Sequence, residues 1–215
     1  MTLDELIDRV DRIVQDDNFD ETEITKYLNR GVLQIARGVR RPDSSILTPP
    51  LPMLFEIGTV STTTTFKADL PVDYQRDLVF AADSIGRELA INDSFQEFVK
   101  TYPALDTEGT LNALAVKGRV LYYQGIPEDS EAITIHYHRY PVEMIVGSDE
   151  PDGIPEDLQD ELLVNYACKE IYAIKEQGID GSSFNTNKHE QKFQIAVEAL
   201  SASIAADAPP FSFFA

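Results

Sequence analysis

Few residues of this chain have the types and spacing that catalysis or metal binding requires, and the three histidines are the first to consider. His136 and His138 are two residues apart in a predicted strand, so both point to one face, a spacing that can hold a metal ion. No carboxylate or third histidine is near this pair in the sequence, and His189 is on a distant predicted helix. A packed or solvated strand face is the favoured interpretation, so we expect no metal site and no bound cofactor.

Acidic pairs are the next candidates, because two carboxylates at a fixed separation can hydrolyse a glycoside. Asp83 with Glu88 and Glu128 with Asp129 are such pairs, but the chain holds 37 acidic residues, so pairs of this kind arise by chance. The single cysteine, Cys168, is near the apolar stripe of a predicted helix, where a small buried hydrophobe is favoured over a nucleophile. Glycine-rich phosphate loops, Cys-x-x-Cys pairs and Gly-x-Ser-x-Gly are absent from the sequence. We therefore expect no catalytic residues and no enzyme activity.

Tyrosines gather in the β-rich part of the chain, where they can stack on sugars or bases. They are Tyr122, Tyr123, Tyr137 and Tyr140. An aromatic core or a subunit interface is the favoured interpretation of these side chains.

The segment 149–178 is the most informative of the elements that must position these groups. Pro155 suits the start of a helix, since its missing N–H would have no helical partner there, and Gly178 suits the C-terminal cap. Apolar residues recur at steps of three and four, which predicts an amphipathic helix. The expected core residues of this helix are Leu158, Leu162, Leu163, Tyr166, Ile171 and Ile174.

The hydrophobic period changes twice along the chain, and this change sets the expected fold. Two helices with a short acidic turn, the first begun by a Thr2–Glu5 capping box, precede a β-rich stretch that includes a meander of three strands at 113–138. Two more helices follow. The sequence thus predicts an α+β fold in which N- and C-terminal helices form a helical bundle with an inserted antiparallel β-rich module. The expected parts are an N-terminal helical hairpin at 1–44, the inserted module at 45–148, the C-terminal helices at 149–205 and an extended tail at 206–215.

The chain has 215 residues and a net charge of −19, with the greatest acidic excess in residues 146–215. So acidic a chain is not expected to wrap DNA by neutralising phosphates, although it can surround DNA without gripping it. No apolar run approaches the roughly 20 residues that span a membrane, and the acidic, periodic N-terminus is unlike a signal peptide. One cysteine is compatible with folding in a cytosolic environment.

The C-terminal residues are the candidate docking site. Proline keeps them from being helical, and three aromatic side chains are expected to be exposed on the terminus, which often marks a binding segment. Its residues are Pro209, Pro210, Phe211, Phe213 and Phe214. Docking onto another subunit is favoured over folding back onto the same domain.

Several short segments of the sequence, and the order of its predicted helices and strands, resemble the head-to-tail adaptor (connector) proteins of tailed bacteriophages, especially the tail-tubular type. The likeness spans about residues 1–200 and contains no catalytic signature. The matching segments are residues 27–31, 70–74, 133–137, 154–158 and 175–178.

The resemblance implies a structural virion protein at the head-tail junction, assembled in the host cytoplasm. It implies a ring, usually of twelve copies, between the portal protein and the tail nozzle or other tail proteins, with double-stranded DNA passing through the channel during ejection and no membrane partner. C-terminal segments of such adaptors commonly reach the portal. Two alternatives from other classes are a virion-associated carbohydrate-binding module and a cell-wall hydrolase.

Overall fold

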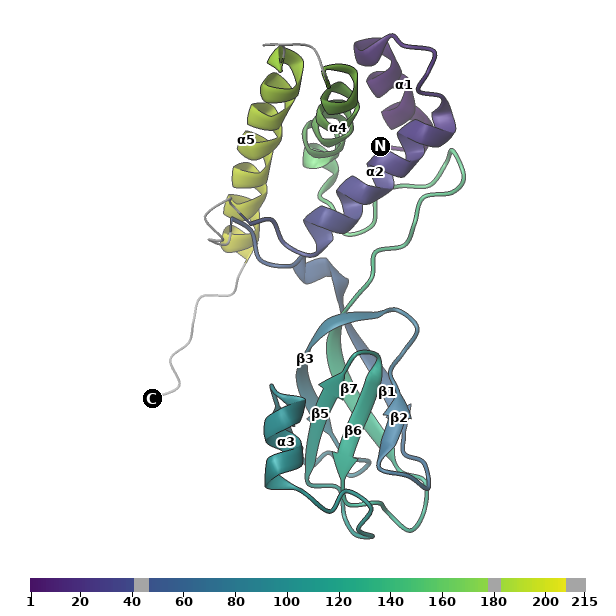
Figure 1. Ribbon diagram of the computed structural model, residues 1–215, viewed down its shortest axis with the longest axis vertical. Helices are drawn as coiled ribbons and strands as arrows, with labels where there is room; N and C mark the ends of the chain where they lie inside the picture. The colour runs from purple at the N-terminus through teal and green to yellow at the C-terminus, as the bar shows by residue number, and fades with distance from the viewer. Residues whose placement is uncertain (41–46, 178–182, 208–215) are drawn as a thin grey trace. The chain divides into compact units, whose positions relative to one another are not determined.

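The computed structural model describes residues 1–40, 47–177 and 183–207 (Figure 1). The chain divides into a helical unit, made of residues 1–54 together with those from Pro141 onward, and a β unit, Phe55–Tyr140. Leu51, Leu54 and Met144 are buried in the core of the helical unit. Residues 47–54 and 141–148, which the sequence analysis assigned to the inserted module, therefore pack with the helices.

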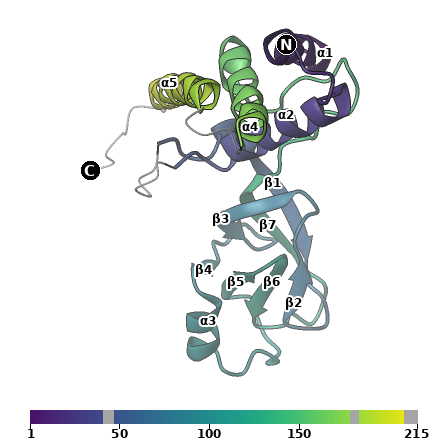
Figure 2. The same cartoon turned by 45° about the horizontal axis from the view of Figure 1, so that its top comes forward.

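Two N-terminal helices and two C-terminal helices build the helical unit (Figures 1 and 2). Helix α1 spans Leu3–Val14, α2 spans Glu21–Ala36, α4 spans Asn165–Lys175 and α5 spans Phe184–Asp207. The Thr2 hydroxyl accepts from the N–H of Glu5, whose carboxylate accepts from the N–H of Thr2, so the predicted capping box is present. The predicted bundle, with helices from both ends of the chain, is confirmed.

The helix expected after Pro155 is not a regular α-helix throughout. A 3₁₀ turn, η2 at Glu156–Leu158, is followed by a π-helical turn, η3 at Asp160–Val164, and only then by α4. In the π turn three consecutive residues, Leu162, Leu163 and Val164, are all buried. The π turn contacts α1, α2 and α5, so side chains on several sides of it are buried, and the period of one apolar stripe does not predict this.

The expected core residues of this segment differ in their burial. Leu162, Leu163, Tyr166 and Ile171 are buried, and Leu158 is partly buried against the same core. Ile174 is 50% exposed, so its predicted core position is wrong. Near this last turn α4 contacts the end of α1 through Tyr172, whose hydroxyl donates to the Ile13 carbonyl. Periodicity predicts the side of the helix on which Ile174 lies. It does not predict whether a neighbouring helix covers that side at the position of Ile174.

A glycine allows α2 to approach this core closely. A Cβ placed on Gly31 would lie 2.8 Å from Cδ1 of Tyr166 and 3.3 Å from Cδ2 of Leu163. Real side chains do not approach so closely, which explains why the tyrosine ring and this helix need a residue without a side chain at their contact.

The β unit contains two sheets and one helix. A three-stranded sheet has the order β1-β7-β3, with β1 at Phe55–Ser61, β7 at Ala132–Arg139 and β3 at Tyr74–Ala82. A four-stranded sheet has the order β2-β6-β5-β4, with these strands at Lys67–Asp69, Val120–Gln124, Ala113–Lys117 and Ala90–Asn92. All pairs are antiparallel except β4 with β5. The predicted fold class, α+β with an inserted β-rich module, is confirmed.

The predicted meander of three strands is wrong at its third strand. β5 and β6 form the expected hairpin, but β7 crosses to the other sheet and becomes its central strand. The long connection after Gly125 allows this crossing, because seven residues separate β6 from β7. Apolar alternation shows which face of a strand is buried but not which strand pairs with it.

Helix α3, Phe95–Thr101, covers part of the four-stranded sheet. Phe98 is fully buried with Ala113 and Ala115 of β5. The β unit thus has an aromatic contact between helix and sheet in addition to the core between its strands.

Candidate functional site

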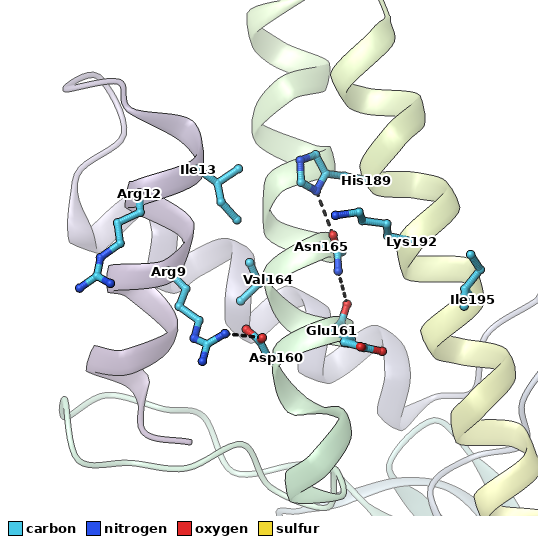
Figure 3. Close-up of a pocket in the computed structure, with 10 residues that line it drawn as sticks. All are labelled: Arg9, Arg12, Ile13, Asp160, Glu161, Val164, Asn165, His189, Lys192 and Ile195. Carbon is cyan, nitrogen blue, oxygen red and sulfur yellow. Dashed lines mark hydrogen bonds and ion pairs between the residues drawn. The ribbon is translucent and has the colours of Figure 1, made fainter.

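A groove on the helical unit, with a volume of about 590 Å³, is the first candidate surface. Figure 3 shows that side chains of α1 and α5 form its walls and that those of η3 and the start of α4 lie between them. Its lining combines three basic and three apolar side chains with two acidic ones. They are Arg9, Arg12, Lys192, Ile13, Val164, Ile195, Asp160 and Glu161.

Hydrogen bonds fix the middle of this groove. The Asn165 amide donates to the Glu161 carbonyl at 2.7 Å, and its oxygen lies 2.9 Å from Nδ1 of His189 (Figure 3). Since the amide oxygen only accepts, Nδ1 of His189 is the donor. Burial lowers the pKa of His189, and so do nearby Lys188 and Lys192. The imidazole is therefore neutral at pH 7 and joins α4 to α5 as a structural group.

A loop that precedes η2 is the second candidate surface. Val142, Ile145 and Val146 are 66%, 79% and 60% exposed, although the loop is held firmly. One carboxylate oxygen of Asp149 accepts from the N–H groups of Ile145 and Val146 at 2.7 and 2.8 Å. The Asn29 side chain accepts from the N–H of Met144 and donates to its carbonyl. We name residues 141–150 the apolar loop; it presents three aliphatic side chains on a preorganised backbone.

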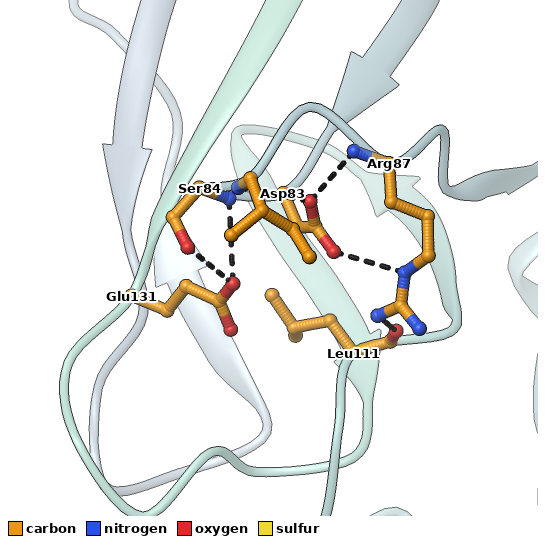
Figure 4. A network of polar contacts seen from close by, with 6 residues as sticks. Asp83, Ser84, Arg87, Leu111 and Glu131 are labelled. Carbon is orange, nitrogen blue, oxygen red and sulfur yellow. Dashed lines mark hydrogen bonds and ion pairs between the residues drawn. The ribbon is translucent and has the colours of Figure 1, made fainter.

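The acidic pair Asp83 and Glu88 consists of a buried carboxylate held in a turn and an exposed one. Asp83 is in the turn after β3, and its side chain is only 2% exposed (Figure 4). Its Oδ1 accepts from the N–H groups of Ile85 and Arg87 at 3.2 and 2.8 Å, and its Oδ2 accepts from Nε of Arg87 at 2.9 Å. Burial acts to raise the pKa of Asp83, but these hydrogen bonds outweigh it and lower the pKa. The general acid of a glycosidase needs a raised pKa, so Asp83 does not suit that role, and its carboxylate closes a turn.

Two more hydrogen bonds extend the same network across the β unit. Nη2 of Arg87 donates to the Leu111 carbonyl at 2.7 Å, and the Ser84 hydroxyl donates to Glu131 at 2.7 Å (Figure 4). The network therefore joins the turn after β3 to the segments before β5 and β7. The second acidic pair, Glu128 and Asp129, is exposed.

The histidines do not converge. His136 and His138 share the outer face of the β1-β7-β3 sheet, where Phe55 and Phe80 pack against them with ring centroids 4.9–5.8 Å apart. His189 belongs to the helical unit and stacks on Tyr172. Within residues 1–40, 47–177 and 183–207, no group of three side chains is placed to bind a metal ion.

The single cysteine and three of the four tyrosines noted in the sequence pack in cores, whereas Tyr140 is 36% exposed. Cys168 is fully buried, and burial raises the pKa of its thiol to about 12, so it stays protonated and unreactive at neutral pH. Tyr123 and Tyr137 are also buried, and the Tyr137 hydroxyl donates to Asp73 at 2.9 Å. Tyr122 packs against Phe95 with ring centroids 4.5 Å apart.

The predicted docking segment, Pro209, Pro210, Phe211, Phe213 and Phe214, is outside the described residues and stays a prediction. The groove and the apolar loop were not predicted from the sequence. The loop had a visible signal, because the run Val142–Val146 is largely apolar beside a segment rich in acids. The groove had none, since α1, η3 and α5 come together only in the folded chain.

Preorganised surfaces that suit contact with other subunits are typical of a structural assembly protein. Over residues 1–210 the chain matches the family model described as SU10 adaptor protein. The chain therefore belongs to the SU10 adaptor protein family, and the expected resemblance to phage head-to-tail adaptors is confirmed. The comparison with curated proteins finds no match. No helix of the described residues is long and apolar enough to cross a membrane.

Proposed function

We propose that copies of this chain form a closed ring between the portal protein and the tail nozzle or another tail protein of a phage. The observation that carries this proposal is the family match over residues 1–210, which includes both units. Twelve copies are proposed, at the head-tail junction of the virion, after assembly in the host cytoplasm. The protein acts by holding subunits together and catalyses no reaction.

Double-stranded DNA passes through the channel of this ring during ejection without specific binding. The chain carries a net charge of −19, so it offers few cations to replace the counterions of the phosphates. Acidic walls repel the duplex, which favours sliding over adhesion.

The C-terminal tail docks onto the portal. Helix α5 ends at Asp207, directly before the segment with two prolines and three phenylalanines. Proline restricts the unbound chain and so reduces the entropy lost on binding. Each phenylalanine contributes roughly 1.5–3 kcal/mol if fully buried in the partner. Repetition around a ring turns modest single contacts into tight attachment.

Deletion of residues 208–215 tests this attachment. We expect a folded protein with an unchanged melting temperature that no longer joins portal-containing heads, measured by counting its copies per particle on purified heads. A chain of full length with Phe211, Phe213 and Phe214 changed to serine separates the aromatic anchors from tail length and is expected to fail in the same way. If either variant joins heads and retains DNA as well as the parent, the tail has no docking role.

A further inference from the structure

Helix α5 presents apolar and basic side chains on its exposed face. Phe184 and Ile195 are 74% and 66% exposed, and Lys188 and Lys192 are exposed between them. These four residues follow one another at steps of four, four and three, so they share one side of the helix. Ile195 and Lys192 also line the groove of Figure 3. We name Phe184, Lys188, Lys192 and Ile195 the α5 face.

The two lysines of the α5 face are not neutralised by ion pairs, although Glu161 lines the same groove as Lys192. No acidic side chain of the described residues is within ion-pair distance of Lys188 or Lys192, although the chain has 37 acids. Like charges four residues apart in a helix repel each other modestly. This arrangement costs the isolated chain a little stability and leaves two cations for an acidic partner.

The apolar loop has the opposite charge and a matching apolar character. The apolar loop, residues 141–150, holds three acidic residues, Glu143, Asp149 and Glu150, and no lysine or arginine. Glu143 and Glu150 are exposed, as are Val142, Ile145 and Val146. Because hydrogen bonds already hold this backbone, little conformational entropy is lost when it binds.

The loop and the α5 face are on different sides of the helical unit. Figures 1 and 2 both show the segment between β7 and η2 passing beside α1 and α2, on the side of the helices away from α5. A surface and its complement that lie on separate sides of one chain produce a head-to-tail contact between copies, which closes into a ring when the rotation permits.

We propose that the apolar loop of one copy docks on the α5 face of the next copy. Ile145 and Val146 cover the apolar surface of Ile195 and the groove beside it, and Glu143 and Glu150 lie near Lys188 and Lys192. The partner is a second copy because this chain supplies both the apolar match and the charge complementarity. The inference rests on the proposed ring and adds the surfaces that build it.

A cysteine pair tests the contact in assembled particles. The variant Ile145→Cys with Ile195→Cys is incorporated into heads, oxidised mildly and run without reductant. We expect a ladder of covalent multimers of this chain, whereas either single variant gives no ladder. The native Cys168 is buried and adds no background. The control pair Ile145→Cys with Lys100→Cys places the second thiol on exposed α3 of the β unit and is expected to give no ladder.

The outcomes separate this inference from the proposed function. If particles contain many copies of the double variant and no ladder forms, the contact is wrong and the ring proposal stands. If the thiol introduced by Ile195→Cys links to the portal instead, the portal covers the α5 face and the inference is overturned. If particles contain no associated copies of even the parent chain, the proposed ring itself fails.

Charge exchange gives an independent test in the same particles. Lys188→Glu with Lys192→Glu is expected to reduce incorporation at least tenfold, and adding Glu143→Lys with Glu150→Lys to the same chain is expected to restore it. Lys100→Glu with Lys117→Glu in the β unit makes the same change in net charge and is expected to have no effect. Equal incorporation of the first variant and this control would overturn the contact.

Discussion

The helical unit and the β unit differ in which parts of the chain form them. The β unit begins and ends with paired strands, since Phe55 lies opposite His138 across β1 and β7. The helical unit is made from both ends of the chain, and its halves are joined by contacts such as Arg9 with Asp160 and Lys175 with the Val14 carbonyl. An inserted unit with paired ends can fold from one continuous segment, whereas the unit around it needs both halves of the chain.

The polar contacts show the same difference on a smaller scale. Asn29 bonds to Met144 across 115 residues, and the N-terminal amine donates to Gln159 across 158 residues. In the β unit the most buried charge, Asp83, pairs with Arg87 only four residues away. Damage to the helical core therefore removes contacts between the two ends of the chain, whereas the contacts of the Asp83 turn, such as Arg87 with Leu111 and Ser84 with Glu131, stay within the β unit.

The largest expected effect is the loss of the helical unit in Leu163→Asp. Leu163 is fully buried, and an unpaired carboxylate at its position costs roughly 4 kcal/mol or more, a large part of the stability of an ordinary domain. Circular dichroism during a urea titration measures the loss of helix, and amide NMR signals of the β unit are expected to persist.

The matched control is Ile174→Asp, the same change in the same segment at a half-exposed side chain. We expect a change within about 0.5 kcal/mol. Equal destabilisation by the two variants would show that Ile174 is a core residue after all. Simultaneous loss of both units in Leu163→Asp would show that they do not fold separately.

The reciprocal change is Phe98→Ala in the β unit. Removal of this fully buried ring leaves a cavity between α3 and β5, and we expect a cost of about 3–5 kcal/mol. Hydrogen exchange is expected to quicken in the β unit and to stay unchanged in α1 and α4. Faster exchange in the helices by the same factor would remove the distinction between the two units.

The smallest effect is expected from Asp83→Asn, because the amide oxygen can still accept from the two N–H groups and Arg87 is half exposed. The pKa of Asp83 is lowered from its ordinary value of 3.8, so the folded state favours the charged form. The stability that this charge provides is present above pH 3.8 and is lost as the pH falls through the lower folded pKa.

Urea midpoints from pH 7 to pH 2 therefore check this prediction. The parent is expected to be more stable than Asp83→Asn at pH 7, and the difference is expected to vanish at the acid end. Glu88→Gln, an exposed neighbour, is the control and is expected to show no difference at either end. A difference that does not change with pH would mean that the charge of Asp83 contributes nothing.

Local signals account for the parts of the fold that the sequence predicted. The Thr2 capping box and the apolar stripes of the helices depend on residues three or four apart, and such patterns can be read directly. The position of β7 depends on pairing between strands far apart in the chain, which alternation does not encode. The π turn at Asp160–Val164 was not predicted for a related reason, since its buried side chains follow no α-helical period.

The surfaces were harder to predict than the cores. Asp83 looked like a possible catalytic acid because the sequence does not show that Ile85 and Arg87 donate to it. Lys192 and Ile13 are 179 residues apart and line the same groove only after α1 and α5 have packed. The sequence indicated a protein that contacts other subunits, but the docking site predicted from it was the C-terminal tail and not the groove or the apolar loop.

The pairing of β1 with β7 has a consequence for how the β unit is inserted into the chain. The two points at which the β unit joins the helices are neighbours in one sheet, so the helices need to accommodate only a gap of about 5 Å, the spacing between strands. Any compact domain whose first and last strands pair can be inserted at the same place without reshaping the bundle. The β unit can thus be exchanged for another domain while the packing of the helical unit stays the same.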